Sequence, residues 1–458
     1  MEDALTLETT IANKTARVSV IGLGYVGLPL AIEFARAGFP VIGIDIDARK
    51  VESLTRGVSY IPDVKSEDVK ILVSQAGFTA TGDYDVLKSV DVIFICVPTP
   101  FDQMKAPDLR PVISATKSIA PRLKAGQLVI LQSTTYPGTT EEVCLPILEE
   151  TGLKAGQDFH LAFSPERIDP GATSSAGWNV KNTPKVLGGL TPRCTDLAKQ
   201  LLVHLTPEVF VVSSPRAAEM TKLLENIFRS VNIALVNELA VLSERMGIDF
   251  WEVIEAAKTK PFGFMPFYPG AGVGGHCIPV DPYYLSWKAR EYDFFTRFIE
   301  LAAEINEGMP FHVIKLVSDA LSREGKPLNS AKVLVLGVSF KRDVDDARNS
   351  PAERVIELLL DRGAQVRYHD PYVPAFKVGG DVFHREKVEL RSVSLTPQAL
   401  RESDAVVIVT PHRSLDYRLI VAHAPLIVDS ANATAGLEHS QRIVRVGASP
   451  SANGGRIS

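Results

Sequence analysis

A glycine-rich loop surrounds Cys277. The run GAGVGGHCIPVDPYYL places this cysteine next to His276 and four residues before Asp281. Glycine lets a ligand approach the backbone closely, and a thiol in such a loop acts as a nucleophile if its pKa is lowered. A lone cysteine is more often a small buried hydrophobe, so the loop by itself leaves both interpretations open.

Lys222 and Asn226 share one face of a predicted helix, because they are four residues apart in PRAAEMTKLLENIFRSVNIALVNELAVLSERMG. An ammonium group and an amide on one face can stabilise a developing oxyanion, and the alternative is an ordinary surface lysine. Apolar residues recur at helical spacing throughout this run. A helix that long usually joins domains or forms a subunit interface.

The run GLGYVG, from Gly22 to Gly27, matches a dinucleotide-binding fingerprint. It follows the strand-like RVSVIG and precedes an apolar-periodic helix, and Asp45 ends the next strand. Gly22 permits the tight turn, Gly24 lets the backbone approach the pyrophosphate, and the last glycine allows close helix–strand packing. Phosphates then face the N–H groups of the helix N-terminus.

The residues after the second strand favour NAD over NADP. The carboxylate of Asp45 would accept hydrogen bonds from the ribose hydroxyls and repel a 2′-phosphate. Arg49 lies close by in the sequence and would suit a 2′-phosphate, which keeps NADP open as the alternative. The other alternative is a tight turn without a ligand.

Strand-like and helix-like segments alternate in both halves of the chain, which predicts an α/β protein with two doubly wound, Rossmann-like domains. A long central helix and a small helical domain lie between them. The predicted divisions are an NAD-binding domain (1–212), a central helical domain with the cysteine loop (213–312), a C-terminal nucleotide-binding domain (313–440) and a disordered tail (441–458). The second doubly wound domain lacks the glycine fingerprint and carries Lys341 and Arg342 instead, as expected for basic side chains that bind a nucleotide.

Composition excludes several classes of function. The 458 residues carry 49 Lys and Arg against 54 Asp and Glu, so no basic excess suggests nucleic acid or a membrane surface. The sequence starts without a secretory signal and has no apolar run long enough to cross a bilayer. The four cysteines lack metal-binding spacing, so we expect no metal, no disulfide framework and a reducing cytoplasm.

The motifs together resemble the UDP-glucose/GDP-mannose dehydrogenase family from about Arg17 to about Thr434. The resembling segments occur in the family's order and are VIGLGYVGLPLA, QSTTYPGTT, FSPERIDPG, EMTKLLENIFRSVNIALVNE, FYPGAGVGGHCIPVDPYYL and VLGVSFKRDVDDARNSPA. Within the family, the second, third and fifth segments are most similar to bacterial UDP-N-acetylhexosamine 6-dehydrogenases, especially those acting on UDP-N-acetylglucosamine.

The resemblance implies an NAD-dependent, four-electron oxidation of the sugar C6 hydroxyl to a carboxylate, for surface polysaccharide biosynthesis. Two NAD molecules are used in turn. Cys277 would add to the intermediate aldehyde as a thiohemiacetal, and the second oxidation would give a thioester that water hydrolyses. The implied partners are a UDP-sugar and a second copy of the chain, with the long helix as the core of a homodimer or higher homo-oligomer.

The resemblance also implies roles for individual residues. The implied catalytic residues are Cys277, Lys222, Asn226, Asp281, Thr134 and Glu166. The implied cofactor-binding residues are Gly22, Gly24, Tyr25, Val26, Gly27, Asp45, Arg49, Pro98, Thr99, Thr134 and Arg348. The implied substrate-binding residues are Glu166, Arg167, Lys222, Asn226, Tyr268, Gly270, Gly274, Gly275, Phe340 and Lys341. Lys222 and Asn226 would steady the oxyanion, whereas Thr134 and Asp281 would orient water and assist proton transfer.

Two positions depart from the family pattern. Pro170, next to Asp169, replaces a second glutamate that UDP-glucose members commonly have, and this favours the N-acetyl-sugar subgroup. Ala431, in the run Asp-Ser-Ala-Asn, replaces the usual arginine of Asp-x-Arg-Asn. Loss of a guanidinium that contacts the substrate would weaken binding by about 1.5–3 kcal/mol, unless Arg413 or Arg442 substitutes for it.

Several alternatives remain at this stage. The same chemistry could act on UDP-glucose, UDP-N-acetylmannosamine or GDP-mannose. A two-electron dehydrogenase of small 3-hydroxy acids also pairs a Rossmann domain with a long helix, but it would need neither Cys277 nor a second nucleotide-binding domain. A non-catalytic paralogue that binds NAD and a UDP-sugar is supported only by Ala431.

Overall fold

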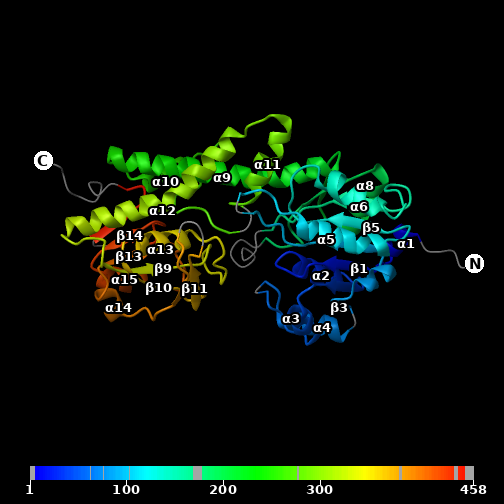
Figure 1. Ribbon diagram of the computed structural model, residues 1–458, viewed down its shortest axis with the longest axis horizontal. Helices are drawn as coiled ribbons and strands as arrows, with labels where there is room; N and C mark the ends of the chain where they lie inside the picture. Colours follow the sequence, from blue (N-terminus) through cyan, green and yellow to red (C-terminus); the bar gives the residue numbers. More distant parts are fainter. Residues whose placement is uncertain are drawn as a thin grey trace, which may run out of the picture. The chain divides into compact units, whose positions relative to one another are not determined.

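The computed structural model describes residues 6–61, 63–75, 77–102, 104–168, 178–275, 278–380, 384–437 and 442–448. The chain divides into two compact units, both shown in Figure 1. The first unit comprises Met1–Glu225 and Tyr283–Phe295, and the second comprises Asn226–Pro282 and Thr296–Ser458. The division into three domains stays a prediction of the sequence.

The first unit is built on one sheet with the strand order β3-β2-β1-β4-β5-β6-β7-β8. Neighbouring strands pair in parallel, except that β6 and β7 are antiparallel. The strands are β1 (Val18–Ile21), β2 (Val41–Ile44), β3 (Phe78–Thr81), β4 (Val92–Ile95), β5 (Leu128–Leu131), β6 (His160–Phe163), β7 (Lys185–Gly189) and β8 (Val209–Val211). The order of the first six is that of a dinucleotide-binding Rossmann sheet, with its switch point between β1 and β4.

Central strands of this sheet are apolar except for Ser19 in β1, because helices cover both of their faces. Every residue of β1, β4 and β5 is buried. The helices of this unit are α1 (Leu7–Ala12), α2 (Gly27–Arg36), α3 (Ala48–Thr55), α4 (Ser66–Ser74), α5 (Arg110–Ile119), α6 (Leu145–Glu149) and α8 (Pro192–Leu202). Short helical turns are η1 (Tyr84–Ser89), η2 (Ala120–Arg122), η3 (Thr140–Cys144) and η4 (Arg290–Tyr292).

The second unit holds a parallel sheet with the order β10-β9-β13-β14-β15. Its strands are β9 (Lys332–Leu336), β10 (Gln365–His369), β13 (Ala405–Ile408), β14 (Ile427–Asp429) and β15 (Ile443–Arg445), and β11 (Ala375–Val378) pairs with β12 (Val388–Arg391) as a separate hairpin. This is the flavodoxin-like order, whose switch point lies between β9 and β13.

Helices of the second unit include α10 (Phe250–Lys258), α12 (Arg297–Arg323), α13 (Pro351–Asp361), α14 (Pro397–Arg401) and α15 (Tyr417–His423). Two helices run from one unit into the other along the chain, namely α9 (Pro215–Met246) and α11 (Asp281–Ala289). The predicted long helix is thus confirmed as α9, which Figure 1 draws in green. The predicted fold class, with two doubly wound parallel sheets, is also confirmed.

The predicted start of the tail at residue 441 is wrong. Residues Ile443–Arg445 form β15, which pairs with β14 in parallel, and Ile443 and Val446 are buried. The run Ile-Val-Arg-Val is a short strand pattern, but the small polar residues that follow it favoured the prediction of a disordered tail. Residues 449–458 lie outside the described residues.

Candidate functional site

The three fingerprint glycines meet three different steric requirements. Gly22 has a φ of 91°, a conformation that favours glycine. A Cβ on Gly27 would lie 1.8 Å from the carbonyl oxygen of Gly22, so α2 packs against the turn too closely for any side chain. A Cβ on Gly24 would have no protein atom within 4 Å, so this glycine instead leaves open space where a pyrophosphate can approach the backbone. The loop therefore fits a dinucleotide.

We predict that alanine substitutions separate these requirements. Gly27→Ala should lower the free energy of unfolding by about 1–3 kcal/mol, because the loop and α2 must move apart. Gly24→Ala should leave stability within about 0.5 kcal/mol of wild type and should weaken NAD binding. Urea unfolding and calorimetric titration with NAD measure the two effects. Equal destabilisation by both substitutions would contradict this assignment.

The carboxylate of Asp45 is buried at the end of β2, where it accepts hydrogen bonds from the backbone N–H groups of Leu23 and Asp47, each at 2.9 Å. Its charge partner is Lys50, whose Nζ lies 3.0 Å from Oδ2. Arg49 instead forms an ion pair with Asp47 and is almost fully exposed. A hollow of about 470 Å³ beside Asp45 is lined by Ile46, Ala48, Val51, Glu52, Thr55, Arg56 and Gly82. The partly apolar hollow next to the carboxylate suits the adenosine end of NAD.

Other predicted cofactor residues lie around the same switch point. Pro98 and Thr99 follow β4, and the Thr99 carbonyl accepts a hydrogen bond from the Tyr284 hydroxyl. Tyr25 and Val26 line a pocket of about 270 Å³ together with Glu166. The fold thus brings Glu166 to the fingerprint loop from far along the sequence.

Glu166 is held by an extensive set of donors. Its Oε2 lies 2.7 Å from Nζ of Lys185, and its Oε1 accepts the backbone N–H groups of Arg167 and Ile168. Gln132 donates to Oε2 at 3.2 Å. Burial by itself would raise the pKa of Glu166, but the charge of Lys185 and these hydrogen bonds outweigh it and lower the pKa. An ionised, fully paired carboxylate is a weak base, so the arrangement favours a positioning role for Glu166.

Thr134 follows β5 and is partly exposed, whereas Ser133 and Thr135 beside it are buried. The segment that continues from it is tied to α9 by Glu219, which is fully buried. One oxygen of Glu219 accepts the backbone N–H of Gly138 and the other accepts both the N–H and the hydroxyl of Thr140. Arg167 is also tied to α9, because its Nε donates to Glu225 at 2.8 Å.

On α9, Lys222 and Asn226 lie one turn apart and both side chains are buried, at 7% and 4% exposure. A surface lysine is thereby excluded. The amide of Asn226 donates to the carboxylate of Asp281, the first residue of α11, over 2.5 Å. Asp281 is itself 3% exposed. Polar side chains buried in this way are commonly functional, since burial without full compensation costs free energy.

The predicted nucleophile Cys277 and its neighbour His276 lie outside the described residues. The other three cysteines, Cys96, Cys144 and Cys194, are free and buried. Burial raises the pKa of Cys96, and it raises that of Cys144 to about 12. Since the thiolate is the nucleophile, neither Cys96 nor Cys144 is suited to covalent catalysis.

The glycine loop that leads to Cys277 is anchored by buried amides. Gly270 donates its N–H to Oδ1 of Asn237 on α9, and Nδ2 of Asn237 donates to Oδ1 of Asn306 on α12. Asn306 in turn donates to the carbonyl of Ser230 at 3.1 Å. Both asparagines are buried, so the start of the loop is fixed to two helices of the second unit.

We predict that Asn306→Ala loosens this anchor. It removes the acceptor of the Asn237 Nδ2 group and one donor to the Ser230 carbonyl, which should lower the free energy of unfolding by about 1–3 kcal/mol and reduce kcat. Urea unfolding and steady-state kinetics check this. Gln398→Ala is the control, because its side chain bonds Glu402 on the exposed surface of α14, and it should change stability by less than about 0.5 kcal/mol. Equal effects of the two substitutions would contradict the anchor.

The far end of the loop meets the residues predicted to hold the nucleotide sugar. Asn349 donates its amide to the carbonyl of Gly275 at 3.1 Å. A Cβ on Gly274 would lie 2.9 Å from the Cβ of Phe340, so this glycine permits close packing against Phe340. Tyr268 stacks on Trp251 and donates its hydroxyl to Glu255. Gly274 and Gly275 thus lie beside Phe340, whereas Gly270 is held at the other end of the loop, and their role in substrate binding stays a prediction.

The arginines of the second unit differ in their surroundings. Arg413 pairs with Asp343, two residues after Lys341, whereas Arg442 donates to the carbonyl of Ala424. Arg445 donates to Asn432 and Asp249. Of the two arginines considered as substitutes, Arg413 is the one next to the predicted nucleotide loop. Arg348 pairs with Asp346 and has an exposed side chain.

Sequence reasoning missed Lys50, Lys185, Glu219, Asn237, Asn306, Asp370 and His412. Asp370 had a usable signal, because it follows the second strand of its domain as Asp45 does in the first. The partners of the others lie far away in the sequence, and no local pattern marks them.

Within the described residues, no cluster of three His, Cys, Asp or Glu side chains could hold a metal ion. The helices described there include none that is both long and apolar enough to cross a membrane.

Family models match most of the chain. The NAD-binding domain of the UDP-glucose/GDP-mannose dehydrogenase family matches residues 16–206, its central domain 216–308, and its UDP-binding domain 334–436. The glycine loop, Asp45 and the adjoining hollow thus coincide with the NAD-binding domain.

Similar proteins agree with these matches. A UDP-N-acetyl-D-glucosamine 6-dehydrogenase from Pseudomonas aeruginosa is 40% identical over 79% of this chain and 84% of its own length. A UDP-N-acetyl-D-mannosamine dehydrogenase from Pyrococcus horikoshii is 37% identical over 86% of this chain and 89% of its own. The solved structure of a UDP-D-ManNAc dehydrogenase from Pyrococcus horikoshii superposes with a TM-score of 0.84 at 33% identity, covering 94% and 99% of the two chains. The chain therefore belongs to the UDP-glucose/GDP-mannose dehydrogenase family of NAD-dependent nucleotide-sugar dehydrogenases.

Proposed function

We propose that this dehydrogenase oxidises the C6 hydroxyl of a UDP-N-acetylhexosamine, UDP-N-acetylglucosamine first among them, to the uronic acid. The observation that carries the proposal is the buried hydrogen bond between Asn226 and Asp281, with Lys222 buried one turn earlier on α9, because such groups suit negative charge that develops on an alcohol oxygen. The P. aeruginosa relative, at 40% identity, supports UDP-N-acetylglucosamine as the sugar.

The proposed reaction removes four electrons in two oxidations, and NAD, when bound, supplies the hydride acceptor for each. In the first oxidation the C6 hydroxyl loses its proton and the carbon becomes an aldehyde. The Cys277 thiolate then forms a C–S bond to that carbon, and protonation of the oxygen gives a thiohemiacetal. The second oxidation removes the hydroxyl proton and a hydride from C6 and yields a thioester. Water adds to the thioester carbonyl, the C–S bond breaks, and the thiolate and carboxylate are released.

The chain's own residues divide this work. Lys222 and Asn226 would stabilise negative charge on the C6 oxygen at each stage. Asp281 is the candidate to move protons, and its bond from Asn226 fixes the orientation of its carboxylate. Thr134 would orient the hydrolytic water. Glu166, because Lys185 pairs with it, would position neighbouring groups rather than accept protons.

UDP-N-acetylmannosamine is the second candidate substrate. The P. horikoshii relative that acts on this epimer matches a longer part of the chain, although at lower identity. The two epimers differ at one sugar carbon, so shape complementarity around one N-acetyl group decides between them.

A substrate panel tests the proposal. We would compare kcat/KM with NAD for UDP-N-acetylglucosamine, UDP-N-acetylmannosamine, UDP-glucose and GDP-mannose. The highest value with UDP-N-acetylglucosamine supports the proposal, and a preference for another sugar reassigns the substrate. Tight binding of NAD and UDP without turnover of any sugar would favour a non-catalytic paralogue and implicate Ala431.

We also propose that the chain forms a homodimer through α9. Exposed apolar side chains recur along this helix at the helical spacing of one face, namely Leu224, Phe228, Leu235, Leu239, Leu242 and Met246. Sedimentation velocity should give twice the chain mass, and Leu235→Glu together with Leu242→Glu should give a monomer. A monomeric wild-type protein would overturn the proposal.

A further inference from the structure

Two loops meet at the switch point of the second unit's sheet. The first loop, residues 338–343, follows β9 and is named the β9 loop. It carries Phe340 and Lys341, which are predicted to hold the nucleotide sugar. The second follows β13 and carries His412. In a sheet of this order, ligands bind outside the carboxyl ends of the strands at the switch point. The conformation of the β9 loop therefore bears directly on nucleotide binding.

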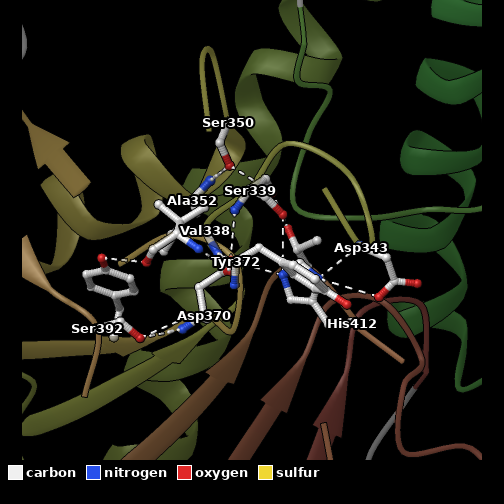
Figure 2. Close-up of polar contacts among 12 residues, drawn as sticks. Val338, Ser339, Asp343, Ser350, Ala352, Asp370, Tyr372, Ser392 and His412 are labelled. Atoms are coloured by element: carbon white, nitrogen blue, oxygen red, sulfur yellow. Dashed lines mark hydrogen bonds and ion pairs between the residues drawn. The ribbon is translucent and has the colours of Figure 1, made fainter. Parts of the chain in front are cut away.

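Asp370, at the end of β10, is the hub that holds the start of the β9 loop (Figure 2). Its Oδ2 accepts the backbone N–H groups of Val338 and Ser339 at 2.7 and 3.1 Å, and also Nε2 of His412 at 3.0 Å. Its Oδ1 accepts the N–H groups of Tyr372 and Val373. Burial opposes ionisation of Asp370, but these donors outweigh it and lower the pKa of the carboxyl. The side chain of Asp370 is therefore a buried, ionised carboxylate.

His412 reaches the other end of the loop. The side chain is completely buried, and its Nδ1 accepts the backbone N–H of Asp343 at 3.0 Å. A nitrogen that accepts an amide proton carries none of its own, so the neutral ring has its proton on Nε2, which faces Asp370. Both ring nitrogens are thus used, one at each end of the loop (Figure 2).

Neighbouring groups tighten the same loop. Thr410, two residues before His412, donates its hydroxyl to the carbonyl of Ser339 at 2.6 Å. Ser339 donates its own hydroxyl to the carbonyl of Lys341 at 2.8 Å. The backbone of the β9 loop around Phe340 and Lys341 is thereby fixed before any ligand arrives, which reduces the ordering cost of binding.

We propose that His412 is a positioning residue for the nucleotide-sugar site, acting through the β9 loop. It spans from the Asp370 carboxylate to the Asp343 amide and so sets the backbone that presents Phe340 and Lys341. This inference rests on the proposed function, because it takes those two residues as contacts of the UDP-sugar. The side chain of His412 is completely buried, so we expect it to act through the loop and not by contact with a ligand.

The test is His412→Phe, which keeps a ring but removes both hydrogen bonds. We expect the Kd for UDP, measured by calorimetry, and the KM for the UDP-sugar to rise about 10-fold, the scale of one buried hydrogen bond to a charged group. The kcat and the KM for NAD should change less than twofold. His412→Gln restores a donor for Asp370, and His412→Asn restores an acceptor near Asp343. The Kd for UDP of both variants should therefore lie between those of the wild type and of His412→Phe.

His423→Phe is the matched control, because this partly exposed histidine of α15 bonds Arg401 and faces no predicted ligand. A folded His412→Phe variant with wild-type Kd for UDP would overturn the proposal. If that variant does not fold, amide hydrogen exchange of the wild-type protein tests the proposal instead. Fast, unprotected exchange of the Asp343 amide would show that its hydrogen bond to His412 is absent and would overturn the proposal. A wild-type protein that binds no UDP would refute the proposed function as well, whereas normal UDP binding by both proteins refutes only the positioning role.

Discussion

Replacing Cys277 with alanine should lower the rate of uronic acid formation by ~10³-fold or more, because no other group can form the thioester. Cys96, Cys144 and Cys194 are all buried in the first unit, and burial raises the pKa of the first two. Binding of NAD and UDP should stay within about twofold of wild type, since the thiol contributes to chemistry rather than to affinity. Pre-steady-state NADH formation and product analysis by mass spectrometry measure the effect.

Cys144→Ala is the matched control for this experiment. Cys144 is the last residue of η3, and its buried thiol accepts a hydrogen bond from Thr116 of α5. The substitution should lower stability and leave kcat per folded molecule unchanged. If Cys277→Ala kept its full rate of acid formation, the covalent mechanism would be wrong and a hydrated aldehyde would become the substrate of the second oxidation.

Replacing Lys185 with methionine should cost about 3–5 kcal/mol of unfolding free energy at pH 7, the largest stability effect that we expect. Lys185 is 2% exposed and its Nζ lies 2.7 Å from Glu166, whose carboxylate would be left buried without its charge partner. The double variant Lys185→Met with Glu166→Gln should recover part of the loss, because it buries no unpaired charge. Urea unfolding of the wild type, both single variants and the double variant gives the coupling free energy.

The Lys185 effect should also depend on pH. Since the folded protein lowers the pKa of Glu166, the ionised carboxylate stabilises the wild type above the unfolded value of about 4.3, and this contribution disappears as pH falls through the folded pKa. In Lys185→Met, protonation of Glu166 instead relieves an unpaired buried charge. The difference in unfolding free energy between the wild type and Lys185→Met should therefore become smaller as pH falls from 7 towards 4. A difference that is constant over this range would show that Lys185 acts through packing alone.

The elements and their order could be predicted because each one leaves a local pattern. Buried parallel strands are continuous apolar runs, and the fingerprint glycines mark the turn between β1 and α2. The different steric reasons for Gly22, Gly24 and Gly27 also follow from the fingerprint. By contrast, β15 was missed because a three-residue strand beside a polar segment carries little signal.

The partners of the site residues could not be predicted, because they depend on tertiary packing. At the start of α3, Arg49 forms its ion pair with Asp47, and Lys50 forms the ion pair with Asp45. Lys185 reaches Glu166 only because β7 lies beside β6 in the sheet. Asn237 and Asn306 meet through the packing of α9 and α12, which neither helix pattern reveals.

The stoichiometry of NADH to sugar shows whether the enzyme carries out both oxidations. Purified protein would be incubated with excess NAD and a limiting amount of UDP-N-acetylglucosamine until the sugar is consumed. We expect about two NADH per sugar and an acidic product, since two oxidations of one carbon release four electrons. One NADH per sugar with an aldehyde product would contradict this expectation, because Cys277 would then take no part in a second oxidation.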